Sequence, residues 1–132
     1  MSQIYVPNVG EAYLLKSGTI TNNFSLGLFQ NDLSVSHGTV LGDITAANYT
    51  GYAVKTLTAA NWAHTIEGNK AHAEYAQQNF VAGTIGTSNT IYGVYCYYTT
   101  ILVFVEVFDE AVVVDTTGQV ISYVPVIEAA TA

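Results

Sequence analysis

The stretch at residues 90–108, TIYGVYCYYTTILVFVEVF, decides the fold class of this chain. It is rich in β-branched and aromatic residues, which favour strands. It predicts two successive strands, Thr90–Tyr98 and Thr100–Phe108. Residues 101–108 are apolar on both faces, whereas an antiparallel strand with one solvated face alternates. We therefore expect a cover over the second face, either the other sheet with a short helix or a neighbouring subunit.

The remainder of the chain predicts one helix and several more short strands. Asn8 followed three residues later by Glu11 is a helix-start signal, and Gly18 is placed to end a helix, so we expect a helix over residues 8–17. A turn at residues 115–118, with a glycine at its end, joins the last two expected strands. The other expected strands are residues 24–30, 52–58, 61–66, 71–80, 111–114 and 119–126.

These elements predict the fold class. Short strands at this spacing, with no helices between them, favour antiparallel pairing, because parallel pairing needs long crossover connections. We therefore expect an all-β protein, an antiparallel β-sandwich or jelly-roll-like fold, with one short N-terminal helix. The length of 132 residues suits a single domain over residues 1–132. We expect its ends to be an extended N-terminal arm, residues 1–7, and a C-terminal tail, residues 124–132.

The charge balance excludes several classes of function. The chain has three lysines, no arginine and ten acidic residues, and its formal net charge is -7. A phosphate backbone would be repelled, so we expect no nucleic-acid partner. The longest charge-free run, residues 75–105, is interrupted by many polar residues, so we expect no membrane span. The single cysteine, Cys96, allows no internal disulfide, and we expect a buried, inert thiol.

Two histidines flank the predicted hairpin turn. A three-residue loop would place His64 and His72 opposite each other, within reach of one metal ion. A two-residue loop would pair Glu67 with Lys70 and put the histidines on opposite faces, because a one-residue register slip turns every side chain over. We favour the two-residue loop, since it pairs opposite charges and places Gly-Asn in the turn. We therefore expect no metal site.

The sequence carries no catalytic signature, so we expect a protein that is not an enzyme and needs no cofactor. Glu106 lies on an apolar face with Leu102 and Phe104 and is the single candidate for acid–base chemistry; the alternative is an exposed position or the rim of an interface. A set of aromatic side chains suits stacking on sugar rings, and a carbohydrate-binding β-sandwich module is one alternative function. These residue types suit strands and protein interfaces equally well. The set is Trp62, Tyr92, Tyr95, Tyr97 and Tyr98.

Several segments, taken together, carry a resemblance to a known group of proteins. The more telling ones are Gly-Tyr-Ala-x-Lys-Thr-Leu at residues 51–57 and Ile-Tyr-Gly at residues 91–93. The others are PNVGE at 7–11, LK at 15–16, LGLFQND at 26–32, YT at 49–50, Trp62, YAQQNF at 75–80 and NT at 89–90. Through about residue 110 the chain resembles small β-rich structural proteins of tailed bacteriophages. The resemblance implies a virion component, either a head decoration or cement protein or a tail- or fibre-associated part, and implies no active site.

Such a role sets expectations for partners and interfaces. The resemblance implies binding to the major capsid protein or to another virion structural protein. The acidic charge favours the outer surface of the shell, or the tail, over the wall that faces packaged DNA. Apolar ends and a two-sided apolar strand favour a homo-oligomer, for which we take a trimer as the working form. The interface candidates are Ile4, Tyr5, Val6, Val103, Val105, Val107, Val124, Val126 and Ile127.

Overall fold

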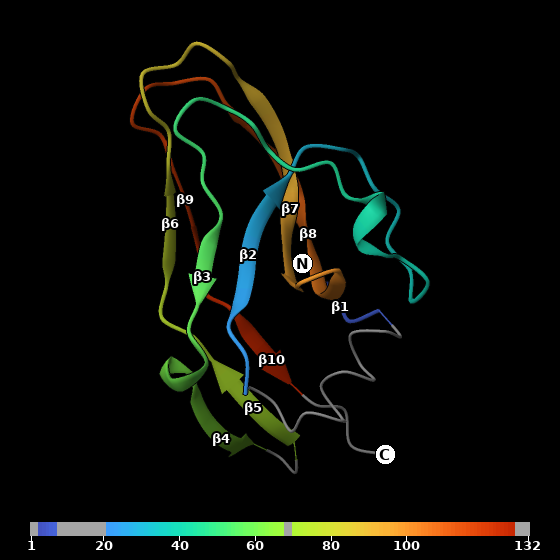
Figure 1. The fold of residues 1–132 in the computed structure, drawn as a ribbon. Coiled ribbons are helices and arrows are strands. Elements are labelled where there is room, and N and C mark those ends of the chain that lie inside the picture. The colour runs from blue at the N-terminus through green and yellow to red at the C-terminus, as the bar shows by residue number, and fades with distance from the viewer. Residues whose placement is uncertain (1–2, 8–20, 68–69, 129–132) are drawn as a thin grey trace.

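Antiparallel strands dominate the structure, a computed structural model that describes residues 3–7, 21–67 and 70–128 (Figure 1). In chain order the described elements are β1 (Gln3–Tyr5), β2 (Phe24–Phe29), the 3-10 helix η1 (Leu41–Asp43), β3 (Lys55–Leu57), the 3-10 helix η2 (Ala59–Asn61), β4 (Ala63–Glu67), β5 (Lys70–Glu74), β6 (Gln78–Val81), β7 (Asn89–Tyr98), β8 (Ile101–Val114), β9 (Val120–Tyr123) and β10 (Val126–Glu128). Every pair among these strands is antiparallel, which confirms the expected all-β class. The helix expected at residues 8–17 lies outside the described residues.

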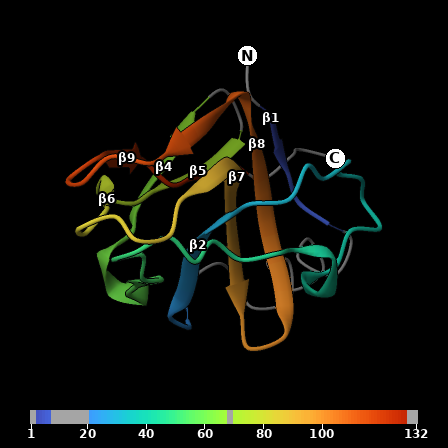
Figure 2. The ribbon, with the colours of Figure 1, turned by 90° about the horizontal axis from the view of Figure 1, so that it is seen from above.

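The strands form three sheets. The largest has five strands in the order β1-β8-β7-β2-β3, and the other two have the orders β10-β5-β4 and β6-β9. Seen from above, β7 and β8 run side by side through the middle of the molecule, with β1 on one side and β2 on the other (Figure 2). The main hydrophobic core contains side chains from all three sheets, among them Leu26 of β2, Phe80 of β6 and Ile127 of β10. This core therefore lies where the five-stranded sheet meets the two smaller sheets.

The two small sheets are built from the same two segments of the chain. β5 pairs with β10, and β6, which follows β5, pairs with β9, which precedes β10. Between these two ladders the amide of Tyr75 donates a hydrogen bond to the carbonyl of Pro125 at 2.9 Å. Because proline has no N–H to donate, it interrupts a ladder. The strands expected at residues 71–80 and 119–126 are therefore each divided in two.

β8 is a single strand of 14 residues, whereas the sequence predicted separate strands at 100–108 and 111–114. The register with β7 shifts between Ile91 and Gly93, and residues 108–111 of β8 have no partner residue on β7. Extra residues of this kind form a bulge, which bends a strand without ending it. The two predicted strands are thus the paired halves of one strand.

A second register shift decides which way the side chains of β8 point. Leu102 and Phe104 pair with the neighbouring residues 97 and 96 of β7, so Val103 is an extra residue. An extra residue turns the side chains that follow it to the opposite face. Leu102 accordingly belongs to a different hydrophobic cluster from Phe104. The expectation that Leu102 shares a face with Phe104 and Glu106 is therefore wrong.

The second face of the five-stranded sheet is covered by a loop of the same chain. The second hydrophobic cluster, on this face, consists of Phe29, Tyr95, Leu102 and Val105. The loop side chains packed against it are Leu33, Val35, Leu41 and Ile44. We expected another sheet with the short helix, or a neighbouring subunit, to provide this cover; the described residues show the loop in this place, and the helix lies outside them. The physical reason is that the loop carries its own apolar side chains, Leu33 and Val35 at alternate positions and Leu41 and Ile44 at the 3-10 helix η1, and these are only partly exposed.

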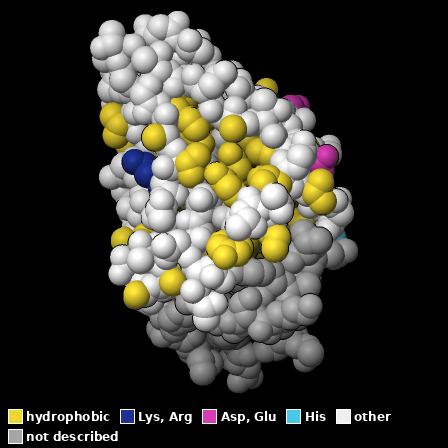
Figure 3. Space-filling model, viewed as in Figure 1, with side chains coloured by type: hydrophobic (Ala, Val, Ile, Leu, Met, Phe, Trp, Pro, Cys, Tyr) yellow, Lys and Arg dark blue, Asp and Glu magenta, His cyan; other side chains and the backbone are white. Residues whose placement is uncertain are grey.

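Burial removes two residues from the interface candidates, because Val105 lies in the second cluster beneath the loop and Val103 belongs to the main core. Val103 and Val105 are both 0% exposed, so they belong to the interior and are not available to a partner. Tyr92, Tyr97 and Val107 pack against the margin of the second cluster and are only half-buried. Figure 3 shows hydrophobic side chains gathered on the face seen in Figure 1, over β2 and β7. The loop therefore buries the centre of the second cluster and leaves its margin at the surface.

Candidate binding site between the arm and the tail

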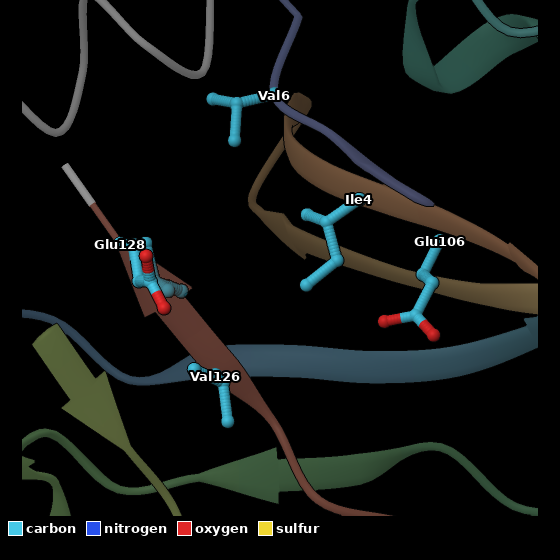
Figure 4. Close-up of a pocket in the computed structure, with 6 residues that line it drawn as sticks. Ile4, Val6, Glu106, Val126 and Glu128 are labelled. Carbon is cyan, nitrogen blue, oxygen red and sulfur yellow. The ribbon is translucent and has the colours of Figure 1, made fainter. Parts of the chain in front are cut away.

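The arm and the tail meet around one cavity. It has a volume of about 440 Å³ and lies between β1, β8 and β10 (Figure 4). Its lining residues are Ile4, Val6, Glu106, Val126, Ile127 and Glu128. Four of the six were interface candidates, and Glu106 was the single candidate for acid–base chemistry. The structure thus brings together, from both ends of the chain, residues that the sequence singled out separately.

The arm reaches the cavity because it pairs with the middle of β8. The register places Ile4 opposite Glu106, with Tyr5 opposite Val105. Residues directly opposite each other in an antiparallel pair point to the same face, so the side chains of Ile4 and Glu106 are neighbours. Ile4 is 40% exposed, which leaves one wall of the cavity at the surface. Val6 follows on the same side of the arm and packs against the main core.

The tail reaches the cavity from the three-stranded sheet. β10 pairs with β5, with Val126 opposite Glu74, Ile127 opposite Ala73 and Glu128 opposite residue 72. Ile127 is buried in the main core, and the next residue, Glu128, is exposed. The cavity is therefore bounded by an edge strand of the five-stranded sheet and an edge strand of the three-stranded sheet.

Glu106 is positioned by a hydrogen bond from another sheet. The hydroxyl of Tyr123, on β9, donates to Oε1 of Glu106 at 3.0 Å. Tyr123 is buried, and both burial and the nearby Glu106 carboxylate raise the pKa of its phenol. The phenol therefore keeps its proton at neutral pH and remains a donor. This bond links β9 to β8 at the edge of the cavity.

Glu128 lies beside a histidine on the neighbouring strand. Nδ1 of His72 is 3.5 Å from Oε1 of Glu128, and Nε2 of His72 is 3.7 Å from Oε1 of Glu74. The imidazole thus lies between two carboxylates, one on its own strand and one on the tail.

The hairpin at the end of β4 has the expected register. Glu67 pairs with Lys70, and the residue opposite His72 is Thr65 rather than His64. The register is therefore that of the two-residue loop, as predicted. In the part of the chain that the structure describes, no group of three His, Cys, Asp or Glu residues could hold a metal ion.

The aromatic residues considered for sugar stacking do not share one exposed face. Tyr95 and Trp62 are 4% and 5% exposed, so neither offers its ring to a ligand. Tyr97 stacks on Tyr95 with ring centroids 5.5 Å apart, whereas Tyr98 meets Phe24 of the main core edge-on at 6.4 Å. The buried position expected for Cys96 is confirmed, and burial raises the pKa of its thiol well above the ordinary value.

The remaining interface candidates lie near the cavity without lining it. Tyr5 is half-buried on the arm, Val107 packs against the second cluster, and Val124 precedes the tail strand and is exposed. Sequence reasoning missed Glu128 and Tyr123. The period-two pattern of residues 126–128 places Glu128 on the face of Val126, and this was a usable signal. No local signal indicated Tyr123, because its bond to Glu106 joins two different sheets.

No family model, curated protein or solved structure matches this chain. Among the helices that the structure describes, none is long and apolar enough to cross a membrane. A functional proposal for this protein therefore depends on the site and on the sequence.

Proposed function

We propose that this protein is a non-enzymatic structural protein of a tailed-bacteriophage virion, and that it binds the outer surface of the head shell as a decoration or cement protein. The observation that carries the proposal is the convergence of arm and tail on one cavity. β1 and β10 are edge strands of their sheets. An edge strand offers backbone donors and acceptors to a partner chain. A partner lying between these strands would contact both ends of the chain at once.

Attachment of this kind needs no reactive group. It works through buried apolar area and strand edges. The Cys96 thiol is buried with a raised pKa, so it does not supply a thiolate nucleophile. The Glu106 carboxylate accepts a hydrogen bond that joins two sheets, which is a structural role. These contacts support a binding protein rather than an enzyme.

The finer architecture that fits this role is a β-sandwich. In this arrangement the five-stranded sheet is one layer, and the two small sheets, joined through the Tyr75–Pro125 hydrogen bond, form the other. The main core, which takes side chains from all three sheets, supports this reading. Sandwiches leave their edge strands at the sides, where a neighbouring subunit can reach them.

The expected partner is the major capsid protein or another virion structural protein, together with further copies of this chain. The net charge of -7 favours the outer surface of the shell, because packaged DNA would repel the protein. A homo-oligomer, with a trimer as the working form, would place several arms and tails around a symmetry axis. Exposed Ile4 and Val124 are the apolar contacts that such an assembly would bury.

The deciding experiment is quantitative mass spectrometry of gradient-purified particles from the source lysate. We expect copy numbers close to those of the major shell protein. A handful of copies per particle would move the protein to the tail or a fibre. Absence from the particles would overturn the virion proposal.

A rebinding experiment would then test the site. Purified chain added to shells that lack it should bind and raise their melting temperature. We expect Ile4→Asp with Val126→Asp to abolish binding, because a buried, unpaired charge in an interface is costly. The matched control is Val113→Asp, an exposed valine of β8 that does not line the cavity, and it should bind normally. Equal binding by both variants would exclude the arm–tail cavity as the contact.

A further inference from the structure

We infer that the outward face of the two-stranded sheet β6-β9 is a contact between two copies of this chain. This face, called the β6–β9 face below, consists of Asn79 and Val81 of β6, Val120 and Ser122 of β9, and Val124, which follows β9. None of these residues lines the cavity between the arm and the tail. The contact is therefore separate from that site and does not depend on the proposed function.

The two faces of this small sheet have opposite characters. β6 and β9 are paired over all of their residues and lie side by side at the left of Figure 1. Phe80 and Ile121 are opposite each other and are buried in the main core. Because side chains alternate along a strand, the residues next to them point outward. Val81 and Val120 are directly opposite each other on this outward side and are 49% and 48% exposed.

Exposed apolar side chains gather on the β6–β9 face. The described residues include seven exposed large apolar side chains, and three of them, Val81, Val120 and Val124, belong to this face. Single exposed apolar residues are ordinary, whereas a contiguous group of them marks an interaction surface. The other four are spread over separate segments, at Ile4, Val40, Val54 and Val113.

The polar end of the face is hydrogen-bonded within one copy. Oδ1 of Asn79 accepts bonds from the hydroxyl of Ser122 at 2.8 Å and from Nε2 of Gln77 at 3.0 Å. Covering a polar group is costly when it loses its hydrogen-bond partner, and less so when it keeps one. The Asn79 oxygen can therefore be covered together with the two valines.

The distribution of charge selects a second copy as the partner. β6 and β9 contain no charged residue, whereas every strand of the other small sheet does: Glu67 in β4, Lys70 and Glu74 in β5, and Glu128 in β10. A charge-free face offers no ion pair to a basic partner. Two copies with a net charge of -7 repel each other, and the repulsion is weakest where neither presents a carboxylate. The β6–β9 face therefore fits a partner of the same charge.

Identical faces that meet are related by a two-fold axis. An axis through the valine pair brings Val81 and Val120 of both copies together, with Asn79 and Ser122 at the rim. A standard interface has roughly 20–30 residues on each side, so a face of five residues supports a weak contact, with a Kd of about 0.1–1 mM. The contact joins copies in pairs and is distinct from the arm–tail contacts of the proposed assembly.

The test is a dilution series of the full-length, valine-labelled protein between about 0.05 and 2 mM, a range that spans the expected Kd. Methyl NMR spectra and sedimentation velocity follow the association. We expect the methyl signals of Val81 and Val120 to shift as the concentration rises, together with a rise in the sedimentation coefficient. The signals of Val113, which is exposed on β8, should not shift.

Charge variants at one position identify the partner as a second copy. Val120→Glu and Val120→Lys each place like charges opposite each other across the axis, so each alone should associate at least about tenfold more weakly. An equal mixture of the two should regain association, because opposite charges then meet. The matched control, Val113→Glu, adds the same charge outside the face and should associate like the natural sequence. If the Val120 variants do not fold, Val81→Glu and Val81→Lys repeat the test on β6.

Three outcomes would overturn the inference. The first is a protein that stays monomeric at about 2 mM, above the expected Kd. The second is equal weakening by Val113→Glu and Val120→Glu, and the third is a mixture of folded Glu and Lys variants that associates no better than either alone. All three measurements use the isolated protein, so they leave the copy number in particles as a separate test of the proposed function.

Discussion

Two neighbouring residues of β8 meet opposite environments. Val105 is completely buried in the second cluster, under a loop of the same chain. Glu106, the next residue, points to the other face and lines the cavity between the arm and the tail. One face of the sheet is therefore closed by a loop of the chain, whereas part of the other face borders the cavity.

The difference lies in how each cover is attached. Four hydrogen bonds of 2.9 Å hold the loop. Two are backbone bonds, from Gln30 to Thr45 and from Ala47 to Leu28. The side chain of Asn31 makes the other two, one with residue 43 and one with residue 45. In the part of the chain that the structure describes, the arm and the tail are each held by three residue pairs along one edge. A connected loop with many local bonds needs less ordering than two short strands from opposite ends of the chain. The comparison shows that the face covered by a connected loop is buried more completely than the face bordered by the two ends of the chain.

The largest expected effect is alkaline destabilisation at one tyrosine in each region. Tyr95 lies in the second cluster and Tyr123 beside the cavity, and burial raises the pKa of both phenols above the ordinary 10.0. Above pH 10 the unfolded chain releases these protons while the folded chain retains them, so unfolding is favoured as pH rises. Each phenol should cost about 1.4 kcal/mol per pH unit, or about 4 kcal/mol for both at pH 11.5.

Urea unfolding between pH 8 and 11.5 measures this loss of stability. Tyr123→Phe should make the free energy of unfolding fall less steeply with pH above pH 10, because only the contribution of Tyr95 remains. A free energy of unfolding that does not change above pH 10 would contradict the burial of both phenols.

Truncating one side chain in each region should give clearly different losses of stability for the two faces. Leu102→Ala empties a fully buried site in the second cluster and should cost about 3 kcal/mol. Ile4→Ala, at the exposed wall of the cavity, should cost less than about 1 kcal/mol. Urea denaturation of both variants gives the two values. Similar losses for both would mean that the arm is packed as firmly as the second cluster.

A smaller effect is expected from filling the space at Gly93, which lies between the two regions. A Cβ at this position would contact the backbone oxygen of Glu106 and lie 2.7 Å from the ring of Phe29. Gly93→Ala should therefore destabilise the protein by about 2 kcal/mol through overpacking. The matched control is Gly42→Ala, because a Cβ there meets nothing within 4 Å. Thermal unfolding should show a lower melting temperature for Gly93→Ala alone.

The smallest expected effect is a gain in stability at the turn that joins β7 to β8. Thr99 is exposed and has a positive φ of 51°, a conformation that disfavours a β-branched residue. Thr99→Gly should stabilise the protein by about 0.5 kcal/mol, because glycine adopts this conformation without steric cost. Calorimetry of the variant and the natural sequence measures this difference.

Local patterns predicted the parts of the fold that depend on neighbouring residues. Alternation and β-forming residues located β2, β7 and β8, and the charges of Glu67 and Lys70 predicted the hairpin register correctly. The break at Pro125 and the extra residue at Val103 were missed. Both concern how one strand fits against another, and a bulge leaves little trace in the alternation of a strand that is apolar on both faces.

The candidate site was predicted only in pieces. The sequence indicated the apolar arm, the apolar tail and the unusual Glu106, because each stands out from its own neighbours. Their meeting depends on β1 pairing with residues 105–107 of β8 and on β10 pairing with β5. Such pairings join residues far apart in the chain, and their formation is decided by loop closure and by the packing of the whole core.

The sequence by itself determined the strand-rich class, the acidic charge and the residues that would be either core or interface. Only the tertiary structure decided which of these residues lie in the core and which at the surface: Val103 and Val105 are buried, and Ile4 is exposed. The physical reason is that an apolar side chain is equally suited to a core and to an interface. Whether it is buried depends on which other part of the chain can reach it.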